Sequence, residues 1–321
     1  MTVTSPLLSL PGAVAAEAPD EGVAAHYGDP LREQRRLAEG RGFVDLSNRG
    51  VVRVSGPDRL SWLHSLTTQH LTDLKPGDAT VTLVLSPNGH IEHAMYVVDD
   101  GEALWAHVEP GTAPALVTFL DRMRFLLRVE VEDLTETYAV VFEPRTEPDG
   151  DTSAGEGVVV RATEEGRELF LPRERLAEYG AAHADPAGMW AYEALRVAAY
   201  RPRVGNETDH RTIVHELGWI GTAVHLNKGC YRGQETVARV HNLGRPPRRL
   251  VFLHLDGTEE KLPAHGAPVE LDGRQIGFVT SSARHHELGT IALALVKRNT
   301  AVDAVLTADG VPASQEVVVP A

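Results

Sequence analysis

The chain has 321 residues, which is enough to bury a sizeable core and long for one domain. Its 45 acidic and 31 basic residues give a formal net charge of -14, which excludes a generally basic nucleic-acid-binding surface, although a local basic patch stays open. No apolar run approaches the roughly 18 to 20 residues that a membrane span needs. One cysteine cannot form an intramolecular disulfide, and the N-terminus lacks a signal-peptide pattern. We expect a soluble cytoplasmic protein of two or three domains, with no membrane partner and no direct nucleic-acid binding.

The first part of the chain reads as a tail followed by alternating strands and helices. Residues 1–25 are rich in Ala, Pro, Gly and acids without a sustained period, which predicts a disordered tail. Leu60, Leu63 and Leu66 recur at helical spacing. Two β-rich runs, Ala79 to Leu85 and Ile91 to Val98, flank an Asn-Gly turn and predict a hairpin. We expect a first α+β unit over residues 26–136.

A looser version of the same order follows and predicts a second, related α+β unit over residues 137–245. The acidic stretch from Glu147 to Glu156 has the composition of a surface loop. Asp185 before Pro186 predicts an N-cap and a helix that runs to about Ala199. Short β-rich runs with Asp-Gly turns then predict a C-terminal antiparallel barrel or sandwich over residues 246–321.

The stretch KGCYRGQE, from Lys228 to Glu235, has the most unusual composition in the chain. Two glycines allow close backbone approach or unusual backbone angles, and the cations Lys228 and Arg232 would favour the thiolate of Cys230. The alternative is that Cys230 is a small buried hydrophobe and Lys228 a solvated side chain. Residue chemistry alone leaves both interpretations open.

Several motifs make the chain resemble the YgfZ-type folate-binding proteins, which are relatives of the glycine-cleavage T-protein (aminomethyltransferase). Most are shared with T-protein, whereas K-G-C-Y-x-G-Q-E, matched here at every fixed position, is the discriminating one. The matching stretches are 26–29 (HYGD), 44–47 (VDLS), 54–58 (VSGPD), 67–69 (TTQ), 193–196 (EALR), 228–235 (KGCYRGQE) and 277–281 (GFVTS).

The resemblance implies a three-lobed, ring-like α+β fold with two related α+β units and a C-terminal antiparallel β-barrel. It also implies a central tetrahydrofolate pocket and a role as accessory factor for iron–sulfur enzymes, including those of tRNA thiomethylation, which would be the partners. No stable metal is expected. The candidate catalytic residues are Cys230, Lys228 and Glu92, and the candidate cofactor-binding residues are Tyr231, Gly233, Gln234, Glu235, Arg196 and Asp45.

Two departures from T-protein bear on an alternative function, which is folate-dependent aminomethyl or one-carbon transfer. T-proteins use an acidic residue in a G-G-x-x-D-D type strand, whereas this chain has Glu92 and His93 there. A misplacement of about 1 Å can cost on the order of a hundredfold in rate. T-proteins also carry a folate-binding glutamate where this chain has Ala198. Whether the protein is an enzyme stays open on this basis.

A third alternative is a non-catalytic scaffold with a vestigial pocket, which the alanine at position 198 favours and the intact KGCYRGQE stretch opposes. A cluster is ordinarily held by several thiolates, so the single Cys230 cannot hold one alone. It could supply one ligand transiently, exchange with a partner's sulfur, or react with a one-carbon unit on folate.

Overall fold

The computed structural model describes residues 3–144, 155–257 and 261–320. The chain divides into two compact bodies. Body 1 comprises residues 1–84 and 93–192, and body 2 comprises residues 85–92 and 193–321. Within the described ranges, no helix combines the length and the apolar character needed to cross a membrane. Most of the loop expected at residues 147–156 lies outside the described residues.

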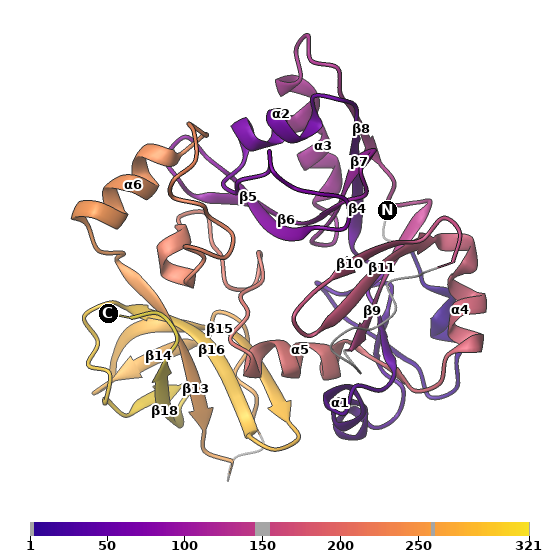
Figure 1. Cartoon of the computed structure of the whole chain (residues 1–321). Helices are drawn as coiled ribbons and strands as arrows, with labels where there is room; N and C mark the ends of the chain where they lie inside the picture. The colour runs from indigo at the N-terminus through magenta and orange to yellow at the C-terminus, as the bar shows by residue number, and fades with distance from the viewer. Residues whose placement is uncertain (1–2, 145–154, 258–260, 321) are drawn as a thin grey trace. The chain divides into compact units, whose positions relative to one another are not determined.

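The first of two five-stranded sheets has the strand order β5-β6-β7-β4-β8 (Figure 1). The expected hairpin is confirmed, since β5 and β6 are neighbours joined by a turn in which Gly89 has φ +79. The expected helix is also confirmed, and Leu63 packs with Val54 and Met95 in one core. The elements are β4 (Gly50–Ser55), α2 (Arg59–Leu66), β5 (Ala79–Leu85), β6 (Ile91–Asp99), β7 (Ala103–Val108), α3 (Ala113–Met123) and β8 (Glu130–Asp133).

The second five-stranded sheet has the order β10-β11-β9-β3-β12. Its strand β3 belongs to this sheet although it precedes residue 136 in the chain, and the domain boundaries at residues 136 and 245 stay predictions. The elements are α1 (Pro30–Ala38), β3 (Phe43–Asp45), β9 (Tyr138–Pro144), β10 (Val159–Ala162), β11 (Gly166–Pro172), η2 (Arg173–Arg175), α4 (Leu176–Ala182), β12 (Pro186–Ala187) and α5 (Met189–Ala198).

The helix expected to begin at Pro186 begins later, so Asp185 is not its N-cap. Pro186 and Ala187 instead form β12, which pairs in parallel with Phe43 and Val44 of β3. Asp185 has a positive φ of 62, and its carboxylate lies 2.9 Å from the guanidinium of Arg36. Sheet pairing with a segment far earlier in the chain thus overrides the local helix signal, and α5 starts only at Met189.

Residues 3–25, expected to be disordered, are ordered and belong to body 1. Leu7 is buried with Phe43 and Leu176 in the core of the second sheet. Residues 3–25 contain η1 (Pro6–Ser9) and β1 (Val14–Ala15), and β1 pairs with β2 (Ala24–His26). Buried apolar contacts therefore order a segment whose composition resembles that of a tail.

The C-terminal part of body 2 is a closed antiparallel barrel, as expected from its turn spacing. Two of its hairpins turn at Asp272-Gly273 and Asp309-Gly310, where all four residues have positive φ, as this class of tight turn requires. Val251, Leu253 and Leu255 alternate along one strand and fill the barrel core. The strands are β13 (Arg248–Leu255), β14 (Pro268–Leu271), β15 (Arg274–His285), β16 (Gly289–Lys297), β17 (Leu306–Ala308) and β18 (Val311–Val317).

Candidate functional site

The KGCYRGQE segment lies in body 2, where a loop leads into α6 (Gln234–Leu243). Gly233 precedes the helix with φ +82, and a Cβ there would lie 2.7 Å from the carbonyl oxygen of Ser86. A Cβ on Gly89 would lie 2.7 Å from Cβ of Thr236. Both glycines thus permit close backbone approach between the β5–β6 turn and the start of α6, which fixes the segment. Gly233 is a candidate cofactor contact, and in the structure its backbone packs against the carbonyl oxygen of Ser86.

The alternative to a functional Cys230 predicted a buried cysteine and a solvated Lys228, and the structure shows the reverse. Cys230 is an exposed free cysteine, so it is not a small buried hydrophobe. Lys228 is only 8 % exposed, so it is not a solvated side chain. Lys228 is thus buried and Cys230 exposed, although free cysteines are usually core residues. Packing does not account for a cysteine at this position.

Lys228 and Tyr231 form a pair within the segment. The ammonium nitrogen of Lys228 lies 5.1 Å from the ring centroid of Tyr231, within the range of a cation–π contact. Burial lowers the pKa of Lys228 to about 8 and raises the pKa of Tyr231 to about 12. At neutral pH the lysine is therefore still mainly charged, and the tyrosine is a neutral phenol.

Glu92 lies on β6 and reaches Arg232 of the segment. A guanidinium nitrogen of Arg232 lies 2.8 Å from a carboxylate oxygen of Glu92. The side chains are 30 % and 38 % exposed, so the pair is partly screened by solvent. The next residue, His93, is half-buried, as expected for strand residues that point to opposite faces. Of the two cations expected to favour a thiolate, Arg232 therefore has its charge matched by a carboxylate.

Gln234 and Glu235 form the first turn of α6. Glu235 is exposed, and Gln234 is partly exposed. A carboxylate in the first turn of a helix interacts favourably with the helix dipole. The amide of Gln234 and the carboxylate of Glu235 therefore lie at the start of α6, four and five residues after Cys230.

Arg196, a candidate cofactor-binding residue, is buried in a network inside body 2. Its guanidinium lies 2.8 Å from the carboxylate of Glu193, three positions earlier on the same helix. Arg196 also donates to Glu207 at 3.0 Å and to the hydroxyl of Ser281 at 2.7 Å. Glu207 further accepts from the hydroxyl of Thr280 and from the backbone N–H of Arg203. This network joins α5 to barrel strand β15, so Arg196 has a positioning role.

Glu207 and Glu216 are fully buried carboxylates in body 2 that sequence reasoning missed. Arg248 donates to Asp209 at 2.6 Å and to Glu216 at 2.8 Å. Glu216 belongs to η3 (Val214–Leu217) and is fully buried. The available signal was the density of acidic residues between positions 203 and 217, since buried carboxylates need cationic partners.

Asp45, the remaining candidate contact, belongs to body 1. Its carboxylate accepts from the hydroxyl of Ser5 and, at 2.9 Å, from the backbone N–H of Ser47. Burial raises the pKa of Asp45, and these hydrogen bonds oppose that rise. Asp45 therefore ties the N-terminal segment to the second sheet.

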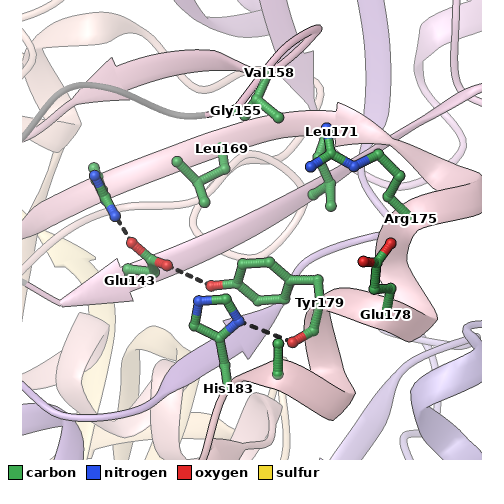
Figure 2. A pocket seen from close by; sticks show the side chains of 11 residues that line it. Glu143, Gly155, Val158, Leu169, Leu171, Arg175, Glu178, Tyr179 and His183 are labelled. Atoms are coloured by element: carbon green, nitrogen blue, oxygen red, sulfur yellow. Dashed lines mark hydrogen bonds and ion pairs between the residues drawn. The ribbon is translucent and has the colours of Figure 1, made fainter.

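A separate cavity of about 270 Å³ lies in body 1, between α4 and the sheet strands β9 and β11 (Figure 2). The rings of Tyr179 and His183 stack at 4.0 Å, and Leu169 is among the other residues that line the cavity. Glu143 accepts from the Tyr179 hydroxyl and from the Arg167 guanidinium. The polar groups of Glu143, Tyr179 and Arg167 thus bond to one another. None of the candidate site residues from the sequence lines this cavity.

Over residues 3–144, 155–257 and 261–320, no three His, Cys, Asp or Glu side chains form a group that could hold a metal ion. The KGCYRGQE segment and Glu92 together offer one thiol, one amine, one guanidinium, one phenol, one amide and two carboxylates.

Comparisons with known proteins identify the family. The GCVT N-terminal domain matches residues 23–142, and the glycine cleavage T-protein C-terminal barrel domain matches residues 248–317. The aminomethyltransferase of Rubrobacter xylanophilus is 32 % identical over 307 residues, which cover 85 % of this chain and 81 % of that protein. The chain belongs to the glycine cleavage T-protein family.

Two further comparisons match the chain to a plant protein and to a solved structure. A chloroplastic protein of Arabidopsis thaliana, whose name describes only a possible transferase, is 27 % identical over 88 % of this chain and 71 % of its own length. The crystal structure of the glycine cleavage system aminomethyltransferase T from Bartonella henselae matches with a TM-score of 0.83 at 18 % identity, covering 99 % of this chain and 97 % of that one. The T-protein α+β fold with a C-terminal barrel is thereby confirmed.

Proposed function

We propose that this T-protein family member is of the YgfZ type: a tetrahydrofolate-binding accessory protein for the assembly or maintenance of iron–sulfur enzymes, acting through Cys230. Enzymes of tRNA thiomethylation are among the proposed clients. The observation that carries the proposal is the exposed thiol of Cys230 in a segment that two close glycine contacts fix in place. A fixed, accessible thiol is suited to contact with a second protein.

The role of Cys230 in this proposal is limited by the number of thiols. A single thiolate can donate one bond to an iron atom or exchange with a sulfur of the client, but it cannot enclose a cluster. The client would supply the other ligands. Such chemistry needs a reduced thiol, so we propose a reducing compartment, the cytoplasm, as the site of action.

The folate part of the proposal depends on the polar groups beside the thiol. A pterin ring needs hydrogen-bond partners along its polar edge, and Tyr231, Gln234 and Glu235 carry groups of that kind. These three residues fit the chemistry of tetrahydrofolate and would hold it. Bound tetrahydrofolate would supply a carrier for a one-carbon unit. Arg196 and Asp45 enter only as positioning residues, because their side chains already bond to neighbours within the protein.

Aminomethyl transfer to tetrahydrofolate is the second candidate function, favoured by the names of the bacterial relatives. The carboxylate available for it is Glu92, whose charge is matched by Arg232. Its two oxygens accept from the Arg232 guanidinium at 2.8 Å and 3.5 Å, so this pair would have to open before Glu92 could contact a substrate amine. For this reason we propose the accessory function first and aminomethyl transfer second.

Calorimetric titration with tetrahydrofolate, under anaerobic and reducing conditions, tests the folate proposal in the wild type and in Cys230→Ala. We expect saturable binding in both proteins, which would leave the thiol for chemistry with a partner. Absence of binding in both would remove folate from the proposal.

The iron–sulfur proposal has its own test. In cells that lack the gene, the activity of an iron–sulfur tRNA thiomethylation enzyme is measured after complementation with the wild type or with Cys230→Ser. We expect restored activity only with the wild type, at equal protein levels. Full restoration by Cys230→Ser, with turnover of an aminomethyl donor by the purified protein, would favour the transferase instead.

A further inference from the structure

The end of α3 and the connection to β8 carry several exposed apolar side chains close together in the sequence. Phe125 is 87 % exposed and Leu126 is 84 % exposed, and Met123 and Leu127 beside them are each 43 % exposed. In Figure 1 this connection extends beyond the end of α3. We name residues 122–128 the α3–β8 knob. Single exposed apolar residues are common, whereas adjacent ones on a projecting turn indicate a contact surface.

The base of the knob is held by hydrogen bonds on both sides. The indole N–H of Trp62 donates to the carbonyl oxygen of Met123 at 3.2 Å, and the N–H of Leu127 donates to the carbonyl oxygen of Arg124 at 2.9 Å. Arg128 donates from its backbone N–H and its guanidinium to Asp58. The apolar side chains are therefore presented on a preorganised turn, which lowers the entropy lost on binding.

The backbone at the tip is in an unfavourable conformation. Phe125 has a φ of +45, a region that bulky side chains rarely adopt and that glycine adopts freely. A selection for stability alone would place glycine or a polar residue there. Exposed apolar side chains on a strained backbone indicate a function outside folding.

The charge around the tip points to the chemistry of the partner. Arg122 and Arg124 are exposed beside the apolar residues, in a chain whose net charge is -14. Arg124 lies 3.6 Å from Asp121, but both side chains are nearly half exposed, so solvent weakens this pair. A positive rim around an apolar tip complements an apolar pocket with an acidic rim. Membrane binding scales with the apolar area inserted, and two largely exposed apolar side chains, Phe125 and Leu126, offer little of it.

We propose that the α3–β8 knob docks a partner protein whose surface combines an apolar pocket, which receives Phe125 and Leu126, with surrounding carboxylates that face Arg122 and Arg124. Aromatic anchors that enter a pocket dominate binding energy at protein interfaces, and a charged rim steers association. The inference is independent of the folate and iron–sulfur proposals.

The test begins with a photo-crosslinking amino acid, benzoylphenylalanine, placed in cells at position 126 of the full chain. Position 305 is the control, because Val305 is also 72 % exposed. We expect one crosslinked protein from position 126 that does not form from position 305. The purified crosslinked protein is then titrated with the wild type, with Phe125→Gly and with Leu126→Ser. We expect at least a tenfold loss of affinity in each variant, and weaker binding as salt rises.

Thermal unfolding of the variants separates docking from folding. Phe125→Gly removes an exposed side chain and relaxes a positive φ, so its midpoint should equal or exceed that of the wild type. The proposal is overturned if position 126 crosslinks nothing, crosslinks only a second copy of this chain, or crosslinks a protein that binds the variants as tightly as the wild type. Sedimentation of the wild type, but not of Leu126→Ser, with phosphatidylcholine–phosphatidylglycerol vesicles would also overturn it in favour of a membrane contact.

Discussion

Arg232 and Glu92 join the segment that carries Cys230 to strand β6, with a nitrogen–oxygen distance of 2.8 Å. They are 140 positions apart in the sequence. The pair brings the carboxylate of the alternative transferase function next to the thiol segment of the proposed accessory function. A change of charge at Glu92 or Arg232 is therefore expected to bear on both proposed functions.

Removing the carboxylate should raise the reactivity of Cys230. Arg232 is two residues from Cys230, and a unit charge at a distance of roughly 7 Å contributes about 0.6 kcal/mol in water. Glu92→Gln leaves that positive charge unmatched and should increase the rate of iodoacetamide alkylation at pH 7 about two- to threefold. The matched variant Arg232→Gln should decrease the rate. Equal rates in all three proteins at low salt would show that the pair does not influence the thiol.

Alanine at either packed glycine should destabilise body 2. Gly89→Ala and Gly233→Ala add a Cβ at 2.7 Å from existing atoms and impose a positive φ on a side chain, so we expect a loss of about 2 to 4 kcal/mol in urea unfolding. Gly221→Ala is the control, because Gly221 has φ +89 but nothing lies within 4 Å of its Cβ position. It should lose only about 1 kcal/mol. Equal losses at all three positions would contradict the close approach.

Lys228 should make the stability of the protein depend on pH. Its pKa is lowered to about 8 in the folded state from 10.5, so between these values the unfolded state binds more protons and stability rises with pH. Lys228→Met removes this dependence. We expect the variant to be more stable at pH 7, by on the order of 1 to 2 kcal/mol after allowance for solvent screening, and this advantage to shrink toward pH 10.

Urea unfolding at pH 7 and pH 9.5 measures the effect, with Cys230→Ser in both proteins so that the thiol does not titrate. A stability difference that is the same at both pH values would mean that the pKa of Lys228 is not lowered.

Removing the charge of Glu207 should loosen the contact between α5 and the barrel. Glu207 is fully buried and accepts from Arg196, Thr280 and the backbone of Arg203. Glu207→Gln leaves the buried guanidinium of Arg196 with one partner fewer, so we expect a loss of about 3 to 5 kcal/mol. Glu193→Gln, at a partly exposed partner of the same arginine, should cost less. The comparison is made by thermal unfolding, and equal losses would contradict the central role of Glu207.

Sequence reasoning succeeded where short-range patterns decide the structure. The leucine spacing predicted α2, the Asn-Gly turn predicted the β5–β6 hairpin, and the Asp-Gly turns predicted the barrel hairpins. It failed at Pro186 and in the N-terminal segment. Both depend on contacts with Phe43, which is remote from them in sequence. A local pattern contains no information about such a partner.

The sequence by itself determined the family resemblance, the turn positions and the presence of one thiol between two cations. Only the tertiary structure decided that Lys228 is buried, that Cys230 is exposed, and that Arg232 pairs with Glu92. The physical reason is that turn formation depends on the φ preferences of adjacent residues. The exposure and charge balance of a side chain depend instead on which distant segments fold against it.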